Sequence, residues 1–287
     1  MTRTERRRPS RLSRVTSRVL AAVSGAVYRG PVRRALGRAL AANRDVTRPR
    51  LELVRGGAAL AGLRIAFLSD LHAGNYFAEG DWLRVCELVA REAPDLVCLG
   101  GDLVNCWERE VELLRKGLGL LHAPLGLFAV PGNHEYQQAA ELRVWRAALE
   151  DAGVEILVNR GRRLARGGAS FWLGGVDDLR RGLPDVAAAL RGRAEDEPVL
   201  LLSHHPDVFA EASQFGVDLQ LSGHTHGGQI AFFGWAPVSH SKLGFVAGPY
   251  ARGASQLYVG RGIGTTFVPL RIGTRGEIPI LELATRS

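Results

Sequence analysis

The sequence has 287 residues, of which 46% are hydrophobic and 23% charged, and its formal net charge is +8. This length and balance are typical of a folded globular chain with one large domain or two small ones, and they argue against a disordered protein. The three cysteines have no C-x-x-C spacing, which argues against a disulfide framework and a structural zinc knuckle and favours a reducing compartment.

The first 50 residues hold most of the positive charge. They contain 14 arginines against two carboxylates, a balance of +12 that leaves −4 for the rest of the chain. The pattern predicts a basic, amphipathic pair of helices between residues 15 and 40. Valines recur at helical spacing, Gly30-Pro31 interrupts them, and a second apolar stripe follows. The longest uncharged run, Val19 to Tyr28, is about half of the roughly 20 residues that a membrane span needs. Arginines interrupt the apolar run that an export signal requires, so we expect no exported chain.

This basic arm, residues 1–58, has two interpretations. One is that residues 1–50 lie on an anionic membrane surface, with apolar side chains facing the lipid and arginines contacting the headgroups. The other is a solvated or self-packed helical hairpin. Pro49 and Gly56-Gly57 predict a domain boundary here, followed by a single catalytic domain over residues 59–287. The expected location is cytoplasmic, with the first interpretation placing the protein on the inner face of the cell membrane.

From residue 63 onward, short apolar runs alternate with helical patterns, which is typical of an α/β domain. Five apolar runs are followed directly by acidic, amide or histidine side chains. These runs span residues 63–68, 95–99, 126–131, 199–202 and 217–221, and helical patterns occupy 82–91, 111–121 and 137–152. Because parallel strands end at the same edge of a sheet, the five polar clusters are predicted to converge.

Six of the eight histidines lie in these clusters, namely His72, His134, His204, His205, His224 and His226. A single histidine or aspartate after a strand is normally a solvated or capping residue, but five coincident clusters indicate a site. Three carboxylate or amide oxygens and four imidazoles form a mixed donor set that suits Mn, Fe or Zn, and the absence of thiolate argues against structural zinc. Seven donors exceed what one ion needs and suit two ions that share a carboxylate, the arrangement used for displacement at phosphorus.

The motifs D-x-H, G-D, G-N-H-E, S-H-x-P-D and G-H-T-H-G-G-Q occur in this order. Together they resemble the calcineurin-like metallophosphoesterase superfamily over roughly residues 60–284. The spacing and the tail LYVGRGIGTTFVPLRIGTRGEIPILEL are similar to a bacterial, membrane-associated branch that includes UDP-2,3-diacylglucosamine pyrophosphatase-like and YkuE-like proteins. The resemblance implies a four-layer α/β/β/α sandwich with two mixed sheets and a metal site at the C-terminal ends of the strands.

The resemblance also implies two divalent metal ions and a role for each motif residue. Asp70, His72 and His226 would bind one ion, and Asn133, His204 and His224 would bind the other. Asp102 would bridge the two ions, and His134 would be the catalytic residue that contacts the substrate. In several relatives a second aspartate follows the bridging one by three positions, whereas Asn105 stands here. We therefore expect His134 to contact phosphate rather than to act as a strong general acid.

Several side chains near the motifs keep open roles. His205 lies between a predicted ligand and Pro206, where packing at the rim or in the core is expected. Arg261 and Arg271 follow the last strand patterns among glycines, where each could contact a phosphate or form a structural ion pair.

The implied function is metal-dependent hydrolysis of a phosphodiester, phosphomonoester or pyrophosphate bond near a membrane, with UDP-2,3-diacylglucosamine as a candidate substrate. One alternative is a nuclease recruited by the arginine-rich arm. The acidic body and the 7% aromatic content argue against it, and no nucleic-acid partner is expected. Another alternative is a catalytically silent binding module on a phosphoesterase scaffold. Such modules lack one or more metal-site residues, whereas all seven occur here.

Overall fold

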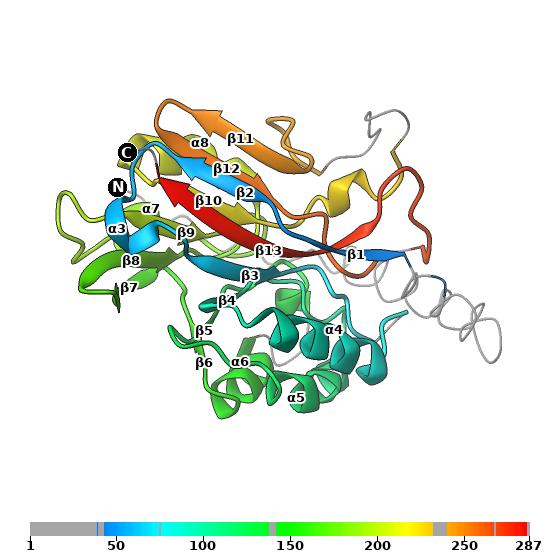
Figure 1. The fold of residues 1–287 in the computed structure, drawn as a ribbon. Coiled ribbons are helices and arrows are strands. Elements are labelled where there is room, and N and C mark those ends of the chain that lie inside the picture. The colour runs from blue at the N-terminus through cyan, green and yellow to red at the C-terminus, as the bar shows by residue number, and fades with distance from the viewer. Residues whose placement is uncertain are drawn as a thin grey trace.

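The computed structural model describes residues 39, 43–74, 76–137, 142–231, 240–266 and 268–285. The amphipathic helices predicted within the basic arm lie outside these residues, apart from Ala39. Two β-sheets dominate the described chain, and Figure 1 shows them stacked between groups of helices.

The first sheet has seven strands in the order β1-β13-β3-β4-β5-β6, with β2 also paired to β13. The neighbours from β3 to β6 are parallel, whereas β13 runs antiparallel to β3. Both β1 and β2 pair in parallel with β13. The strands are β1 (Arg44–Thr47), β2 (Arg50–Leu53), β3 (Arg64–Leu68), β4 (Leu96–Leu99), β5 (Leu127–Ala129), β6 (Val154–Ile156) and β13 (Gly276–Thr285).

The second sheet has six strands in the order β11-β12-β10-β9-β8-β7. Its four central strands are parallel, and the two edge strands, β7 and β11, are antiparallel to their neighbours. The strands are β7 (Arg160–Arg166), β8 (Ala169–Gly175), β9 (Val199–Leu202), β10 (Leu219–Ser222), β11 (Gly248–Arg252) and β12 (Ser255–Val259).

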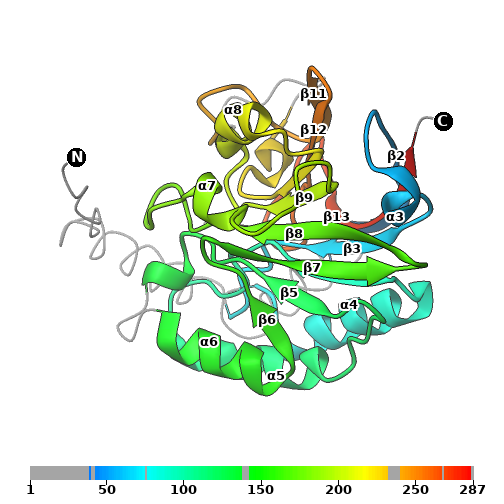
Figure 2. The same cartoon turned by 90° about the vertical axis from the view of Figure 1, so that its left-hand side faces the viewer.

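Helices cover the outer face of each sheet. Figures 1 and 2 show α4, α5 and α6 on the outer side of the first sheet, and Figure 2 shows α7 and α8 on the opposite side of the molecule. The helices are α3 (Gly57–Leu60), α4 (Glu79–Glu92), α5 (Glu112–Leu118), α6 (Leu142–Asp151), α7 (Val186–Ala189) and α8 (Phe209–Ala212). Single 3₁₀ turns occur at Glu108–Val111, Glu135–Gln137, Pro206–Val208, Ser213–Phe215 and His226–Gly228.

The apolar patterns explain these layers. Trp82, Val85, Cys86 and Val89 recur at helical spacing on α4, and this face is buried against the first sheet. All four residues of β4 and all four of β9 are buried, because both faces of these central strands are covered. Between the sheets, side chains such as Phe67 from β3 share one core with side chains from β9 and β10.

The predicted fold class is therefore confirmed: two mixed sheets are packed between helical layers. The expectation of one shared sheet edge needs a correction, because β3, β4 and β5 belong to the first sheet and β9 and β10 to the second. A buried apolar run fits a central strand of either sheet, so periodicity cannot assign its partners. The site is formed where the C-terminal ends of both sheets meet.

The sheet begins within the predicted basic arm. β1 and β2 pair with β13 at positions before residue 58. The shift in charge that suggested the boundary reports surface composition, whereas strand pairing depends on a partner more than 200 positions further along the chain. The division between residues 58 and 59 stays a prediction, but the folded sheet extends back to Arg44.

Candidate metal centre

All seven predicted metal-binding side chains follow directly after strands. Asp70 and His72 follow β3, Asp102 follows β4, and Asn133 follows β5. His204 follows β9, and the remaining two histidines, His224 and His226, follow β10. Every one of these side chains is buried. Six of the seven fall into compact donor groups, and Asn133 lines the pocket beside them.

The backbone at these positions is strained. Five of the seven residues have a positive φ: Asp70 (55°), His72 (48°), Asp102 (51°), His224 (71°) and His226 (54°). A non-glycine residue in this region costs about 1–3 kcal/mol, and such residues concentrate at functional sites. The turns after three different strands therefore adopt backbone angles that non-glycine residues disfavour, and these angles direct the side chains toward one region.

Neighbouring glycines allow these turns to approach one another. Gly101 has a φ of 88°, and a Cβ there would lie 2.5 Å from the backbone nitrogen of Gly132. Only glycine fits where the loops after β4 and β5 touch. Gly227 (φ 60°) plays the same part in the G-H-T-H-G-G-Q turn, where an added Cβ would lie 2.9 Å from a side-chain carbon of Arg261.

The first donor group consists of Asp70, His72 and His226. The two imidazoles face each other with their Nε2 atoms 3.0 Å apart, and an Oδ1 atom of Asp70 lies 3.5 Å from the Nε2 atom of His226. Two lone-pair nitrogens and a carboxylate oxygen at this separation form a set that a divalent cation can hold together.

The second donor group consists of Asp102, His204 and His224. His204 Nε2 lies 3.2 Å from Asp102 Oδ2 and 3.1 Å from His224 Nδ1. The other ring nitrogen of His204 donates to the carbonyl of Gly100 at 2.8 Å, which orients the ring with Nε2 facing Asp102 and His224. The Oδ1 atom of Asn133 is buried without a partner among the described residues, as expected of an oxygen that accepts from a cation.

His224 and His226 thus contribute to different groups. They are separated only by Thr225, and each histidine has a left-handed backbone on either side of the right-handed Thr225, with one ring in each group. Asp102 also lies within 4.8 Å of donor atoms of His72 and His134, so it reaches both sides of the centre. The donor set and its spacing fit two cations with a shared carboxylate.

Burial dominates the electrostatics of the centre. It raises the pKa of Asp70 to about 6 and lowers the pKa of His72 to about 3. Burial also opposes the charged form of His204, but attraction by the Asp102 carboxylate is stronger and raises the pKa of this imidazole well above its usual value. The pKa of His226 is lowered well below its usual value, chiefly by burial. The neutral rings of His72 and His226 are the form that binds a metal ion at neutral pH.

His134 lies beside these donors and lines a pocket of about 190 Å³ above them. Its Nδ1 atom lies 2.6 Å from the backbone carbonyl of Asn105, so Nδ1 carries a proton and donates it. A backbone carbonyl therefore orients this ring.

The residues with open roles are structural. Arg271 is buried, and its guanidinium donates to the carbonyls of His226 (2.9 Å), Arg261 (2.8 Å) and Gly264. It joins two loops at the centre rather than facing the pocket. Arg261 lies 3.5 Å from Glu277. His205 accepts from the backbone nitrogen of Asp207 and so caps the turn after β9.

Sequence reasoning missed Glu135. This buried carboxylate accepts from the backbone nitrogens of Asp102 (2.9 Å), Leu103 (2.7 Å) and Gly132 (2.7 Å), and thereby fixes the turns after β4 and β5. Burial raises its pKa to about 7. The signal was present, because Glu135 is the fourth residue of the G-N-H-E motif and had no assigned role.

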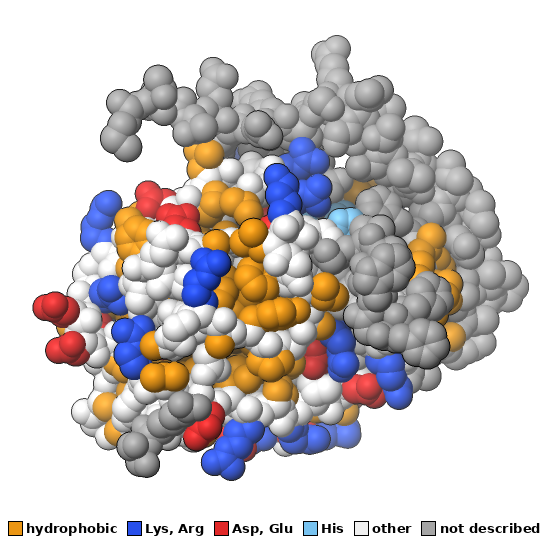
Figure 3. Space-filling model, turned by 90° about the horizontal axis from the view of Figure 1, so that it is seen from above, with side chains coloured by type: hydrophobic (Ala, Val, Ile, Leu, Met, Phe, Trp, Pro, Cys, Tyr) orange, Lys and Arg blue, Asp and Glu red, His pale blue; other side chains and the backbone are white. Residues whose placement is uncertain are grey.

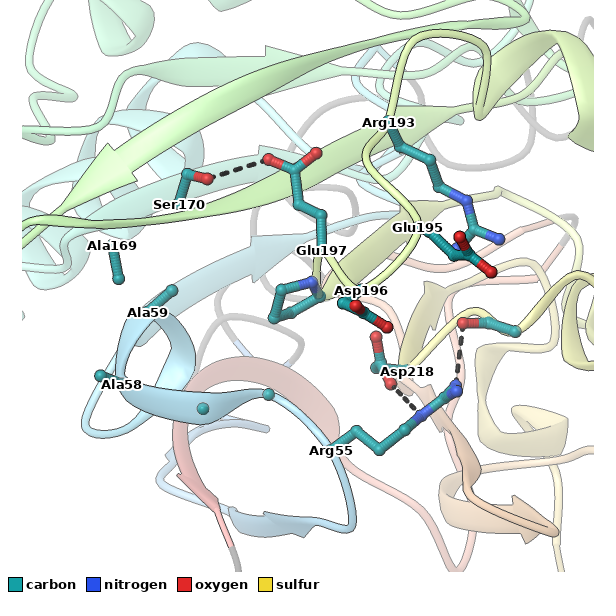
Figure 4. Close-up of a pocket in the computed structure, with 14 residues that line it drawn as sticks. Arg55, Ala58, Ala59, Ala169, Ser170, Arg193, Glu195, Asp196, Glu197 and Asp218 are labelled. Atoms are coloured by element: carbon teal, nitrogen blue, oxygen red, sulfur yellow. Dashed lines mark hydrogen bonds and ion pairs between the residues drawn. The ribbon is translucent and has the colours of Figure 1, made fainter.

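A second pocket, of about 370 Å³, lies at the opposite ends of the second sheet's strands, before β9 and β10 (Figure 4). Four of its charged side chains have partners within the fold. Arg55 contacts Asp218 at 2.8 Å, Glu197 accepts from Ser170, and Arg193 donates to the carbonyl of Phe215. The clustered imidazoles are absent from its walls, so the functional site is the pocket over the metal centre.

Comparison with known proteins decides the family. The family model for calcineurin-like phosphoesterases matches residues 63–228. The chain belongs to this family. The phosphoesterase is 31% identical over 231 residues to the Bacillus subtilis protein named uncharacterized metallophosphoesterase YkuE, covering 77% of this chain and 79% of that protein. It is 32% identical over 224 residues to YpbG of the same organism, covering 77% and 81%. The predicted superfamily and YkuE-like branch are confirmed, and the protein is a metallophosphoesterase.

Some relatives are longer. A Danio rerio protein named transmembrane protein with metallophosphoesterase domain is 31% identical over 242 residues, which cover 78% of this phosphoesterase but only 54% of that relative. Within the described part of this phosphoesterase, no helix is both long and apolar enough to cross a membrane.

Proposed function

We propose that this phosphoesterase hydrolyses phosphate esters with two divalent cations. Asp70, His72 and His226 would hold one ion, and Asn133, His204 and His224 the other, with Asp102 shared between them. The observation that carries the proposal is the pair of buried donor groups, each with its ligand atoms within 4.8 Å of one another. The oxygen and imidazole donors suit Mn, Fe or Zn.

When bound, the two cations supply Lewis acidity and a hydroxide near neutral pH. The chain's own residues orient the substrate. The Asn105 carbonyl accepts from the Nδ1–H of His134, so Nε2 is the ring atom that donates to a phosphoryl oxygen in the pocket when it carries a second proton. Arg271 and Glu135 hold the surrounding turns in place through backbone hydrogen bonds.

A substrate panel tests this function. The full chain, reconstituted in turn with Mn²⁺, Zn²⁺ and Fe²⁺, should hydrolyse aryl phosphodiesters, phosphomonoesters or organic diphosphates, and EDTA should abolish the activity. Asp102→Ala is the matched inactive variant. If two ions bind per chain and no phosphate ester of the panel is cleaved, the protein is instead a binding module on this scaffold.

The proposed substrate is lipid-linked or UDP-linked, with UDP-2,3-diacylglucosamine as the candidate, and the enzyme works at an anionic membrane surface. The loop at residues 268–272 supports a membrane position, because its apolar side chains are exposed and the residues between them are buried. Val268, Leu270 and Ile272 are exposed (43%, 48% and 37%), whereas Pro269 and Arg271 between them are buried. Gln229 ties this loop to the turn after β10 by donating to the carbonyls of Thr266 and Val268. Exposed apolar side chains beside a catalytic pocket are typical of a surface that meets lipid.

Two experiments separate these points. Hydrolysis of aryl phosphodiesters without hydrolysis of UDP-2,3-diacylglucosamine would remove the lipid-precursor substrate. Co-sedimentation with anionic liposomes should be strong for the full chain and weak for a chain that begins at Asn43, which retains β1. Equal sedimentation of the two chains would show that the basic arm has no part in membrane binding.

A further inference from the structure

The pocket above the metal centre has two arginines in its wall that no motif includes. Arg180 and Arg181 line it together with His134, Gln137, His240 and Thr266. On the face seen in Figure 3, Lys and Arg side chains lie beside a visible histidine. The pocket volume of about 190 Å³ is below the roughly 300–1,000 Å³ that encloses a whole drug-sized ligand. It therefore suits the phosphoryl end of a substrate, with the remainder outside.

The loop that carries these arginines is fixed by two carboxylates. Asp178 accepts from the backbone nitrogens of Arg180 (3.0 Å) and Arg181 (2.7 Å). Asp177 accepts from the backbone nitrogen of Leu183 (3.0 Å) and from the hydroxyl of Tyr136, two residues after His134. The loop is thus joined to the turn that presents His134. Both aspartates bind backbone N–H groups, so they anchor the loop's main chain beside the pocket.

The charge of Arg180 acts on the pocket. Its side chain is exposed, and no ion pair joins it to a carboxylate of the described chain. An exposed guanidinium that lines the pocket leaves a positive charge for a ligand to balance.

Charge balance indicates which ligand. The four positive charges of two divalent cations, less the two negative charges of Asp70 and Asp102 and the one of the attacking hydroxide, leave one positive charge, which balances a single esterified phosphoryl group. The metal centre alone is therefore sufficient for one phosphoryl group. The guanidinium of Arg180 at the same pocket adds positive charge that a second, adjacent phosphoryl group would match, and Arg181 lines the pocket beside it. Arginine's planar fork suits phosphate oxygens.

We propose that Arg180 and Arg181 form an anion subsite for a second phosphoryl group, so that the enzyme prefers diphosphate esters over substrates with one phosphoryl group. This inference rests on the proposed phosphoesterase function. The arginines bind the phosphoryl group that is not being attacked, and the fixed loop from Asp177 to Leu183 sets its distance from the metal centre.

Steady-state kinetics of the full chain loaded with Mn²⁺ test the preference. ADP-ribose supplies two adjacent phosphoryl groups, and the p-nitrophenyl ester of thymidine 5′-monophosphate supplies one. Arg180→Ala and Arg181→Ala should each lower kcat/KM for ADP-ribose by about 10- to 100-fold, the loss expected for a charge-assisted hydrogen bond, and leave the single-phosphoryl ester nearly unchanged. Arg180→Lys should recover part of the loss, because lysine keeps the charge without the fork. Arg91→Ala, an exposed arginine on α4, is the control and should change neither substrate.

A binding measurement separates the subsite from the chemistry. In titration calorimetry with the Mn²⁺-loaded protein, methylenediphosphonate should bind more weakly to both alanine variants than to the unaltered chain, and inorganic phosphate should bind equally to all three. Equal losses for both kinetic substrates, or weaker phosphate binding, would mean that the arginines contact the attacked group and would overturn the subsite. The subsite would also be overturned if the alanine substitutions changed neither kcat/KM for ADP-ribose nor the affinity for methylenediphosphonate. If neither substrate is cleaved, the proposed function fails, while calorimetry still decides whether the subsite exists.

Discussion

At the residue scale, Glu135 shows how a carboxylate can position a metal centre without touching a metal. Its two oxygens accept from three backbone nitrogens at 2.9 Å or less, and from that of Val104 at 3.4 Å, in the turns that present Asp102 and His134. Glu135→Ala leaves three buried donors without a partner, each worth about 1–3 kcal/mol, so the free energy of unfolding should fall by at least about 3 kcal/mol. At about 2–4 °C per kcal/mol, the melting temperature should fall by roughly 6–12 °C.

Glu135→Gln keeps one oxygen acceptor and should lose less than the alanine variant. Thermal unfolding followed by circular dichroism measures both, and Glu150→Ala on the exposed face of α6 serves as the control. Melting temperatures for Glu135→Ala and Glu150→Ala that agree within error would show that the anchoring bonds contribute nothing to stability.

His134 is a residue-scale test of catalysis. It lies within reach of His72 and Asp102, so the geometry alone would also permit it to bind an ion. If its role is to contact the substrate, His134→Ala should lower kcat about 100-fold, similar to the loss of an oxyanion-stabilising donor, and leave metal content at two ions per chain. Turnover assays and elemental analysis measure the two quantities. His122→Ala, an exposed histidine away from the pocket, should match the unaltered chain. A drop in bound metal would reassign His134 as a ligand.

At the element scale, β1 and β2 tie the end of the predicted arm into the first sheet. Arg44 donates to the carbonyl of Ile263 at 3.1 Å, Thr47 to Glu277 at 2.7 Å, and Leu51 and Leu53 are buried. Burial of two leucines alone contributes roughly 3–6 kcal/mol. A chain that begins at Asn43 should therefore melt close to the full chain. A chain that begins at Ala59, at the predicted boundary, should melt more than about 10 °C lower or fail to fold.

Differential scanning calorimetry of the three chains measures this difference. Equal melting temperatures of the chains beginning at Asn43 and Ala59 would support the predicted boundary at residue 58. If the chain beginning at Asn43 melts like the full chain and the chain beginning at Ala59 does not, the folded domain starts at β1.

Elements with strong apolar runs were predictable from sequence, and elements defined by their partners were not. The runs that became β3, β4, β9 and β10 are buried on both faces, so their composition identifies them. By contrast, β7 reads RGRRLAR and buries only Leu164, because it is an edge strand whose pairing with β8 supplies its stability. Strands such as β1 are specified by a distant partner, which no local pattern reveals.

The residues of the site were likewise predictable only in part. The seven donors could be predicted because each stands in a motif at the end of an apolar run, and parallel strands bring such ends together. Their supporting residues were missed, since Glu135, Asp178 and the arginines beside it act through contacts across loops. The replacement of a carboxylate by Asn105 was visible in the sequence. Its consequence, a backbone carbonyl that orients His134, required coordinates.

At the scale of the whole molecule, both donor groups span the two sheets. Asp70 and His72 extend from the first sheet to meet His226 from the second, and Asp102 from the first meets His204 and His224 from the second. Cations bound there would cross-link the C-terminal edges of the sheets. They would also offset the cost of five strained residues and of the carboxylates buried among them.

Metal should therefore raise the stability of the entire fold and not only support catalysis. At 100 times its dissociation constant, an ion that binds only the folded chain contributes about 2.7 kcal/mol. Each ion should raise the melting temperature by roughly 5–10 °C for a chain of this size. Calorimetric melting with EDTA, Mn²⁺ and Zn²⁺ measures the shift. His204→Ala should lose the part of the shift due to one ion, because it removes a ligand from one group only, whereas His122→Ala should keep the full shift. A melting temperature that is the same with EDTA and with saturating metal would mean that the two sheet edges are not joined by ions.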